Sequence, residues 1–163
     1  MTKPETDFLT ILKILAAHEV QFIVVGGVCA VLQGAPVSTF DLDIVHARNP
    51  ENIQRLLTAL QELGAIYREH ADRRITPNSS HLESPGHQLL LTKAGPLDLL
   101  GTVSGGRGYE ELVRFVDEMT VGSVSFKVLR LTTLIDLKEE LGRDKDRAVL
   151  SILRRTLEEK QKS

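Results

Sequence analysis

Three aspartates are the side chains of this sequence best suited to chemistry. Asp41 and Asp43 are separated by one residue within residues 40–45, a run that alternates between apolar and acidic side chains as a strand does. On a strand such residues point to one face and lie about 7 Å apart, where two like charges repel by about 2 kcal/mol. Asp98 stands between two leucines in a second strand-like run. Divalent cations such as Mg²⁺ or Mn²⁺, which prefer oxygen ligands, offset repulsion of this kind.

A pair of glycines precedes the aspartates. Residues 20–25 are rich in β-branched side chains, which predicts a buried strand, and Gly26 and Gly27 follow it directly. We expect the glycines to open a short helix, because glycine allows close backbone approach and free N–H groups at a helix start favour an anion such as phosphate. Three acids on adjacent strands beside such a turn form a constellation for two-metal phosphoryl transfer. The alternative for an isolated Asp-x-Asp pair is a solvent-facing strand edge.

Charged residues also stand on the apolar faces of the last two predicted helices. Lys138 lies between Leu134 and Leu141, and Arg143 lies one turn before Asp146. Buried charges are seldom left unpaired, so one interpretation is an ion-pair network that holds the terminal helices to the sheet. The other interpretation places Lys138 or Arg143 on nucleotide phosphates.

Two smaller features have both a chemical and a structural interpretation. Ser38 and Thr39 supply hydroxyl groups next to the first aspartate, either for a nucleotide or simply for a turn before a strand. The glycine-rich residues 101–108 superficially look like a phosphate-binding loop, but such a loop needs Lys and then Ser or Thr at its end. Those positions are Arg107 and Gly108, so we expect a connection beside the cleft.

The combined pattern resembles the nucleotidyltransferase superfamily with the DNA polymerase β fold. That family shows a hydrophobic residue and a Gly-Gly or Gly-Ser pair, then Asp-hydrophobic-Asp/Glu-hydrophobic, and later an acid flanked by apolar residues. This chain shows Val25-Gly26-Gly27, thirteen intervening residues, Asp41-Leu42-Asp43-Ile44, and later Leu97-Asp98-Leu99. It looks most like small bacterial members, including AbiEii-type toxins and minimal transferases, which share Thr39, Lys138, Gly142-Arg143 and Lys145-Asp146. The resemblance extends over residues 8–155.

The resemblance implies a role for each matching residue. Asp41 and Asp43 would bind two Mg²⁺ or Mn²⁺ ions, and Asp98 would complete the second metal site and help activate the acceptor hydroxyl as a general base. Gly26 and Gly27 would hold the triphosphate of an NTP, with Ser38, Thr39, Lys138 and Arg143 as further nucleotide-binding residues. The reaction would move an NMP to a hydroxyl acceptor by in-line attack on the α-phosphate and release pyrophosphate, in a toxin–antitoxin or defence system.

One position departs from the family pattern. Many relatives carry an arginine two residues before the threonine, and this chain has Val37. The departure favours a second hypothesis, a catalytically weak or silent module that binds a nucleotide or a small helical partner protein. A third hypothesis is a structural domain whose acids lie at a sheet edge. RNA, a protein and a small molecule all stay open as the acceptor, and so does the base of the NTP.

Composition excludes several classes of protein. The 163 residues include 20 Lys and Arg against 22 Asp and Glu, a net charge of −2, which weakens any case for nucleic-acid binding through a basic surface. The single cysteine, Cys29, excludes an intramolecular disulfide and a multi-cysteine metal site. The N-terminus has no apolar run like a signal peptide, and no stretch is long enough to span a membrane. We therefore expect a cytoplasmic protein.

The elements that must position these residues alternate between helix and strand. We predict helices at residues 7–18, 28–32, 51–63, 131–141 and 143–159, and strands at residues 20–25, 40–45, 88–92, 96–100, 115–121 and 124–128. Phe40, Leu42 and Ile44 should face the core. Residues 68–88 are expected to be irregular, with at most one weak strand. The prediction is one α/β domain over residues 1–163, with a mixed sheet in a core of about residues 18–130 and helices over about residues 131–160. This matches a minimal nucleotidyltransferase fold with flanking N- and C-terminal helices.

Overall fold

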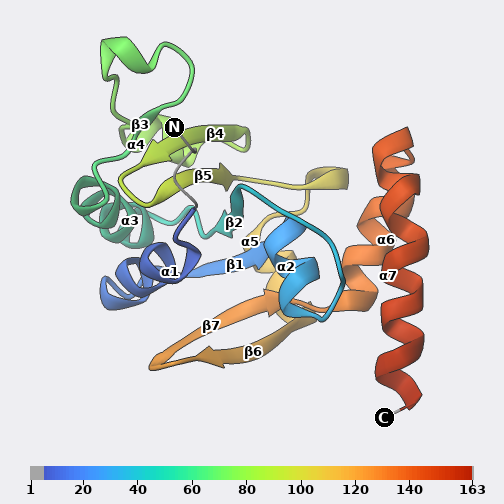
Figure 1. The fold of residues 1–163 in the computed structure, drawn as a ribbon. Helices are drawn as coiled ribbons and strands as arrows, with labels where there is room; N and C mark the ends of the chain where they lie inside the picture. Colours follow the sequence, from blue (N-terminus) through green and yellow to red (C-terminus); the bar gives the residue numbers. More distant parts are fainter. Residues whose placement is uncertain (1–5, 163) are drawn as a thin grey trace, which may run out of the picture.

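A mixed sheet is the frame of the molecule. A computed structural model of the chain describes residues 6–162, so part of the expectation about an N-terminal signal lies outside the described residues. The sheet has the order β3-β4-β5-β2-β1-β7-β6 (Figure 1). Its strands are β1 (Phe22–Val25), β2 (Leu42–His46), β3 (Ile66–Tyr67), β4 (His87–Thr92), β5 (Gly95–Leu100), β6 (Val116–Val121) and β7 (Val124–Leu129). The central β2 runs parallel to β5 and antiparallel to β1, and β1 runs parallel to β7.

The helices gather at two ends of this sheet. They are α1 (Phe8–Ala17), α2 (Gly26–Leu32), α3 (Pro50–Glu62), α4 (Ser79–Glu83), α5 (Tyr109–Leu112), α6 (Leu131–Leu141) and α7 (Asp144–Lys162). In Figure 1, α1 and α3 lie together at one end, and the long α7 stands beside α6 at the other. Between the two ends, the sheet carries the carboxylates described below.

Apolar side chains with a helical spacing bury α1 and α3. Ile11 and Leu15 of α1 and Ile53 and Leu56 of α3 are at most 1% exposed. Side chains cap both helices at their first turn, because the side chain of Asp7 accepts from the backbone of Thr10 and that of Asn49 from the backbone of Asn52. These two helices therefore cover the sheet while the strand ends near the aspartates stay accessible.

A buried amide joins α3 to the strands. The Asn52 side chain is fully buried, accepts from the backbone N–H of Gln21 at 2.6 Å, and donates to the carbonyls of Gln21 and Ala47 at 3.1 and 2.7 Å. Gln21 precedes β1 and Ala47 follows β2. The side chain thus satisfies backbone groups that the sheet ladder leaves free at this end.

The structure confirms the α/β class, the mixed sheet and the flanking helices, and it corrects two details. Phe40 does not face the core: it is 78% exposed, since β2 begins only at Leu42 and the chain before it still bends. Leu42 and Ile44 are buried as predicted. Residues 68–88 contain a 3-10 turn at Ala71–Arg73 and the helix α4 instead of a featureless loop, and the short β3 comes just before them. None of the described residues belongs to a helix long and apolar enough to cross a membrane.

Candidate active site

Asp43 and Asp98 lie side by side on adjacent strands. They are register partners in the parallel pair of β2 and β5, and neighbouring strands are about 4.8 Å apart. The Asp98 side chain is 14% exposed. The sequence does not indicate this register directly, because the two residues are far apart along the chain. The register arises because Leu42 and Ile44 pair with Leu97 and Leu99 in the same core.

Gly26 brings the backbone directly against Asp43. Val25, the last residue of β1, pairs with Asp43, and the next residue turns into α2 with a φ of +68°. A Cβ atom at Gly26 would collide with the Asp43 carboxylate. This position therefore requires glycine both for its left-handed conformation and for the close approach. At Gly27, a side chain would instead meet the hydroxyl of Thr39.

The third aspartate lies just outside the strand. The Asp41 side chain is 43% exposed, and its backbone carbonyl accepts a hydrogen bond of 3.3 Å from the Thr39 hydroxyl. One residue earlier, the carbonyl of Phe40 accepts from the hydroxyl of Thr6 at 2.7 Å. These contacts hold the chain that leads from Thr39 to Asp41, so Thr39 supports the site. Ser38 is exposed, and it is not among the residues that line the cavity described below.

Burial and like charge act together on Asp43. Its Oδ1 atom is buried and has no hydrogen-bond partner. Burial raises the pKa of Asp43 well above its usual range, and the neighbouring charges of Asp98 and Asp41 raise it further, while Lys138 opposes them. The site thus concentrates negative charge around a carboxylate with one buried oxygen, Oδ1, that lacks a partner. Such perturbed acids cluster at functional sites.

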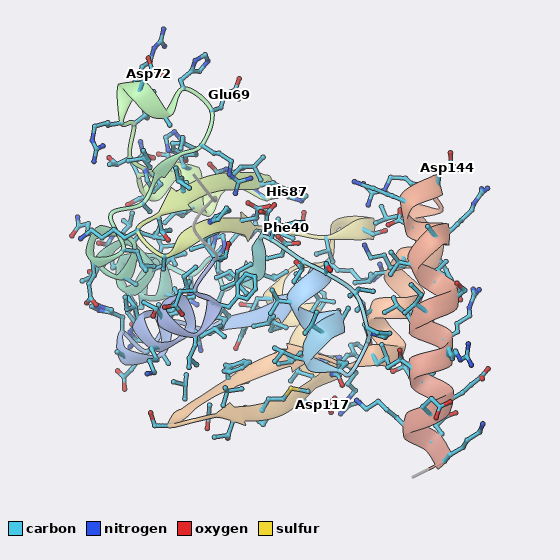
Figure 2. The ribbon with its side chains drawn as sticks, viewed as in Figure 1. Phe40, Glu69, Asp72, His87, Asp117 and Asp144 are labelled. Atoms are coloured by element: carbon cyan, nitrogen blue, oxygen red, sulfur yellow. The ribbon has the colours of Figure 1, made fainter. Side chains whose placement is uncertain are left out.

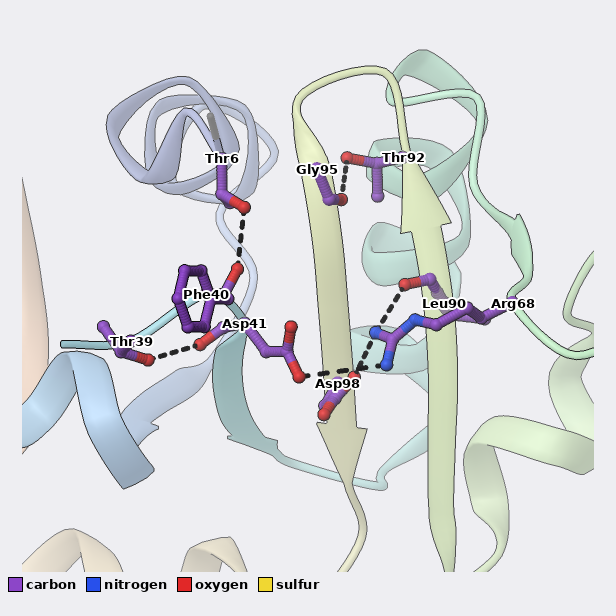
Figure 3. A network of polar contacts seen from close by, with 9 residues as sticks. All are labelled: Thr6, Thr39, Phe40, Asp41, Arg68, Leu90, Thr92, Gly95 and Asp98. Atoms are coloured by element: carbon purple, nitrogen blue, oxygen red, sulfur yellow. Dashed lines mark hydrogen bonds and ion pairs between the residues drawn. The ribbon is translucent and has the colours of Figure 1, made fainter. Parts of the chain in front are cut away.

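Arg68 neutralises part of this charge, and sequence reasoning did not identify it. Figure 3 shows its guanidinium reaching across β4 to the acids. Nη2 donates to Asp98 Oδ1 at 2.6 Å and to the carbonyl of Leu90 at 3.0 Å, and Nη1 lies 3.9 Å from Asp41 Oδ2. The available signal was the position of Arg68 two residues after Ile66, which places both on one face of an extended chain.

Asp43 and Asp98 border a cavity of about 330 Å³, whereas Asp41 is not among its lining residues. Gly26, Asp43 and Asp98 lie on one side and Lys138 and Arg143 on the other, and the lining also includes His87, Leu89, Val103 and Ser104. Larger hollows of 610 Å³ beside α7 and 690 Å³ beside α6 do not border the three aspartates.

The predicted ion-pair network is present, but it joins α6 to α7 instead of holding the terminal helices to the sheet. Asp146 is fully buried and contacts Arg143 Nε at 2.6 Å and Lys138 Nζ at 3.3 Å. The hydrogen bond from Arg143 is the main reason why the pKa of Asp146 falls to about 2. Lys138 and Arg143 nevertheless line the cavity, so their side chains are also placed to contact an anion bound there. Arg107 does not point to a phosphate site, because it holds Glu140 through two contacts of 2.7 and 2.9 Å.

The carboxylate oxygens of this site suit a hard divalent cation, although they are not arranged as a complete metal-binding site. Two carboxylates on adjacent strands, with an unpartnered buried oxygen on Asp43, are the ligands that Mg²⁺ and Mn²⁺ prefer. Across residues 6–162, however, no group of three or more His, Cys, Asp or Glu side chains is placed to hold a metal ion as it stands. Asp98 is engaged by Arg68 instead.

The fold is that of the nucleotidyltransferases, as two solved structures show. A candidate nucleotidyltransferase from Thermotoga maritima, TM1012, superposes with a TM-score of 0.57 and 18% identity, covering 93% of this chain and 90% of its own. The lincosamide antibiotic adenylyltransferase LnuA, solved with lincomycin bound, superposes with a TM-score of 0.62 and 13% identity, covering 93% of this chain and 98% of its own. No family model and no curated protein matches the sequence.

Proposed function

We propose that this chain is a metal-dependent nucleotidyltransferase that moves an NMP from an NTP to a hydroxyl acceptor. The observation that carries the proposal is the pairing of Asp43 with Asp98 in register, directly beside the Gly26 turn. This arrangement puts two carboxylates next to a backbone that can approach a phosphate closely. The similarity of the fold to an adenylyltransferase supports the same chemistry.

Each residue of the site has a task in this proposal. Asp41, Asp43 and Asp98 would hold two Mg²⁺ or Mn²⁺ ions, which when bound neutralise charge on the triphosphate and on the leaving pyrophosphate. Gly26 and Gly27 would admit the triphosphate to the backbone, and Lys138 and Arg143 would face its charge across the cavity. Asp98 would accept the proton of the acceptor hydroxyl as that oxygen attacks the α-phosphate. Thr39 would fix the approach to Asp41, and Ser38 would contribute only at the rim.

The acceptor and the setting are further parts of the proposal. RNA, a protein and a small hydroxyl compound remain the candidates, and LnuA, an adenylyltransferase for lincosamide antibiotics, favours the small compound. The resemblance to small bacterial toxins supports a cytoplasmic toxin–antitoxin or defence system, in which a small helical protein would be the partner.

The test is transfer of label from NTPs. The protein is incubated with Mg²⁺, each α-labelled NTP in turn and cell extract, and both pyrophosphate release and labelled products are measured. Wild type should label an acceptor, whereas Asp41→Ala should lower transfer by at least about a thousandfold while the protein stays folded. Asp72→Asn is the matched control, because Asp72 is an exposed acid on the segment that projects from the sheet (Figure 2). Full activity of Asp41→Ala would refute the assignment.

A second candidate function is a nucleotide-binding module with little turnover. Val37 in place of the expected arginine and the engagement of Asp98 by Arg68 favour it. Nucleotide binding that depends on Mg²⁺ but produces no pyrophosphate, with any NTP and extract, would select this function over the enzyme.

A further inference from the structure

Arg68 occupies the space between two of the acids. Its guanidinium contacts Asp98 Oδ1 at 2.6 Å and lies 3.9 Å from Asp41 Oδ2, so one positive charge sits against both carboxylates (Figure 3). A divalent cation that bridges β2 and β5 through Asp43 and Asp98 would share the Asp98 carboxylate with this guanidinium. Two cations at such distances repel strongly in a half-buried site.

The strands set this position. The backbone N–H of Arg68 donates to the carbonyl of Leu89 at 3.0 Å, which continues the pairing of β3 with β4 by one residue. Leu89 is in turn the register partner of Asp98. The side chain of Arg68 therefore starts on the face of the sheet that carries Asp98, and the contact between them follows from the register of three strands.

The contact is also easy to release. Arg68 Nε is buried without a hydrogen-bond partner, and its side chain is 34% exposed. The chain after Arg68 leaves the sheet and projects outward, as Glu69 and Asp72 show in Figure 2. His70 and Arg74 within it adopt left-handed φ values of 57° and 52°. The guanidinium thus has solvent on one side, and its second ionic partner, Asp41, is itself 43% exposed.

We propose that Arg68 is a resident cation of the site, which holds Asp98 in the metal-free protein and must leave it before a divalent ion binds there. The inference rests on the proposed function, since it concerns the same metal site. Arg68 acts as a positioning residue: it lowers the repulsion among the acids while the site is empty of metal, and it weakens the binding of metal alone.

The experiment measures Mn²⁺ binding in the absence of nucleotide, from the electron paramagnetic resonance signal of free Mn²⁺ at constant ionic strength. Arg68→Gln should bind Mn²⁺ more tightly than wild type, by about tenfold or more. Arg68→Lys keeps the charge and should stay close to wild type. Arg73→Gln removes an exposed arginine of the same segment and is the matched control. If Arg68→Gln fails to fold, as judged by thermal melting, Arg68→Met replaces it.

The outcomes separate this inference from the proposed function. Mn²⁺ binding by Arg68→Gln that equals or falls below that of wild type overturns the inference, and so does an absence of binding in both. Because nucleotide is left out, a role of Arg68 on phosphate cannot produce the expected tightening. Pyrophosphate release by wild type is measured separately and decides the transferase function, so either proposal can fail while the other stands.

Discussion

Asp43 lies in an environment that lowers the stability of the fold. Its Oδ1 is buried without a partner, and Asp98 and Asp41 add like charge. We predict that Asp43→Asn increases the free energy of unfolding by about 1 kcal/mol at pH 8 without divalent ions, because a neutral amide of the same shape removes the repulsion. Urea unfolding measures this. Asp41→Asn should change it less, since Asp41 is half exposed. A less stable Asp43→Asn protein would contradict the prediction.

His46 makes the stability of the fold depend on pH. It is 1% exposed, and its Nε2 contacts the carbonyl of Leu82 at 2.8 Å. Burial lowers the pKa of His46, so the folded protein keeps the ring neutral. The unfolded chain takes up a proton near pH 6.5, and stability is therefore present above that pH and is lost as the pH falls toward the folded pKa. Because Asp43 titrates in the same range in both proteins, the test is the change of the urea midpoint between pH 7.5 and 5.5. Acidification should lower the midpoint more in wild type than in His46→Gln. An equal change of the urea midpoint with pH in both proteins would exclude this role of His46.

The elements depend on a few side chains at their junctions, and Asn52 is one of them. Asn52→Leu would leave the backbone N–H of Gln21 and the carbonyl of Ala47 without their partner. The carbonyl of Gln21 would lose one of its two donors, since it still accepts from the backbone N–H of Ala47 at 3.1 Å. We expect a loss of about 3 kcal/mol in the free energy of unfolding, since each unsatisfied buried group costs on the order of 1 kcal/mol or more. Chemical denaturation of the variant measures the loss. Gln54→Leu, on the exposed side of α3, serves as the control and should change stability little.

The elements also show how far sequence reasoning reaches. The bounds of α3 and of the β4–β5 hairpin were predicted within a residue or two. The local spacing of their apolar residues is enough to indicate which positions are buried. Phe40 was misplaced because alternation alone does not reveal where a strand begins. Asp43 and Asp98 were expected on adjacent strands, and their register supports the site. The spacing of Arg68 from Ile66 indicates only the face on which Arg68 lies. Its contact with Asp98 was missed, because that contact requires the register of β3, β4 and β5 together.

For the whole molecule, binding of a nucleotide substrate should raise the thermal stability. A ligand at a hundred times its Kd stabilises a protein by about 2.7 kcal/mol, which for a chain of this size is a rise in Tm of about 5–10 °C. We predict such a rise with an NTP and Mg²⁺ together, and a much smaller one with the NTP and a chelator. Differential scanning fluorimetry provides the measurement. Asp41→Ala should lose the Mg²⁺-dependent part, and an equal rise with chelator would argue against metal-assisted nucleotide binding.

The strand order has a consequence for how the chain is made. Asp43 and Asp98 belong to β2 and β5, which pair with each other. The other side of β1 pairs with β7, which is translated later, since Ile23 pairs with Lys127. Pairings so distant along the chain form slowly, and synthesis on the ribosome delivers the N-terminal half first. The nascent chain therefore gathers its carboxylates before Lys138 and Arg143 exist. Until α6 and α7 are translated, these carboxylates form an acidic surface beside an open strand, and the cavity with its two cations is complete only with the last helices.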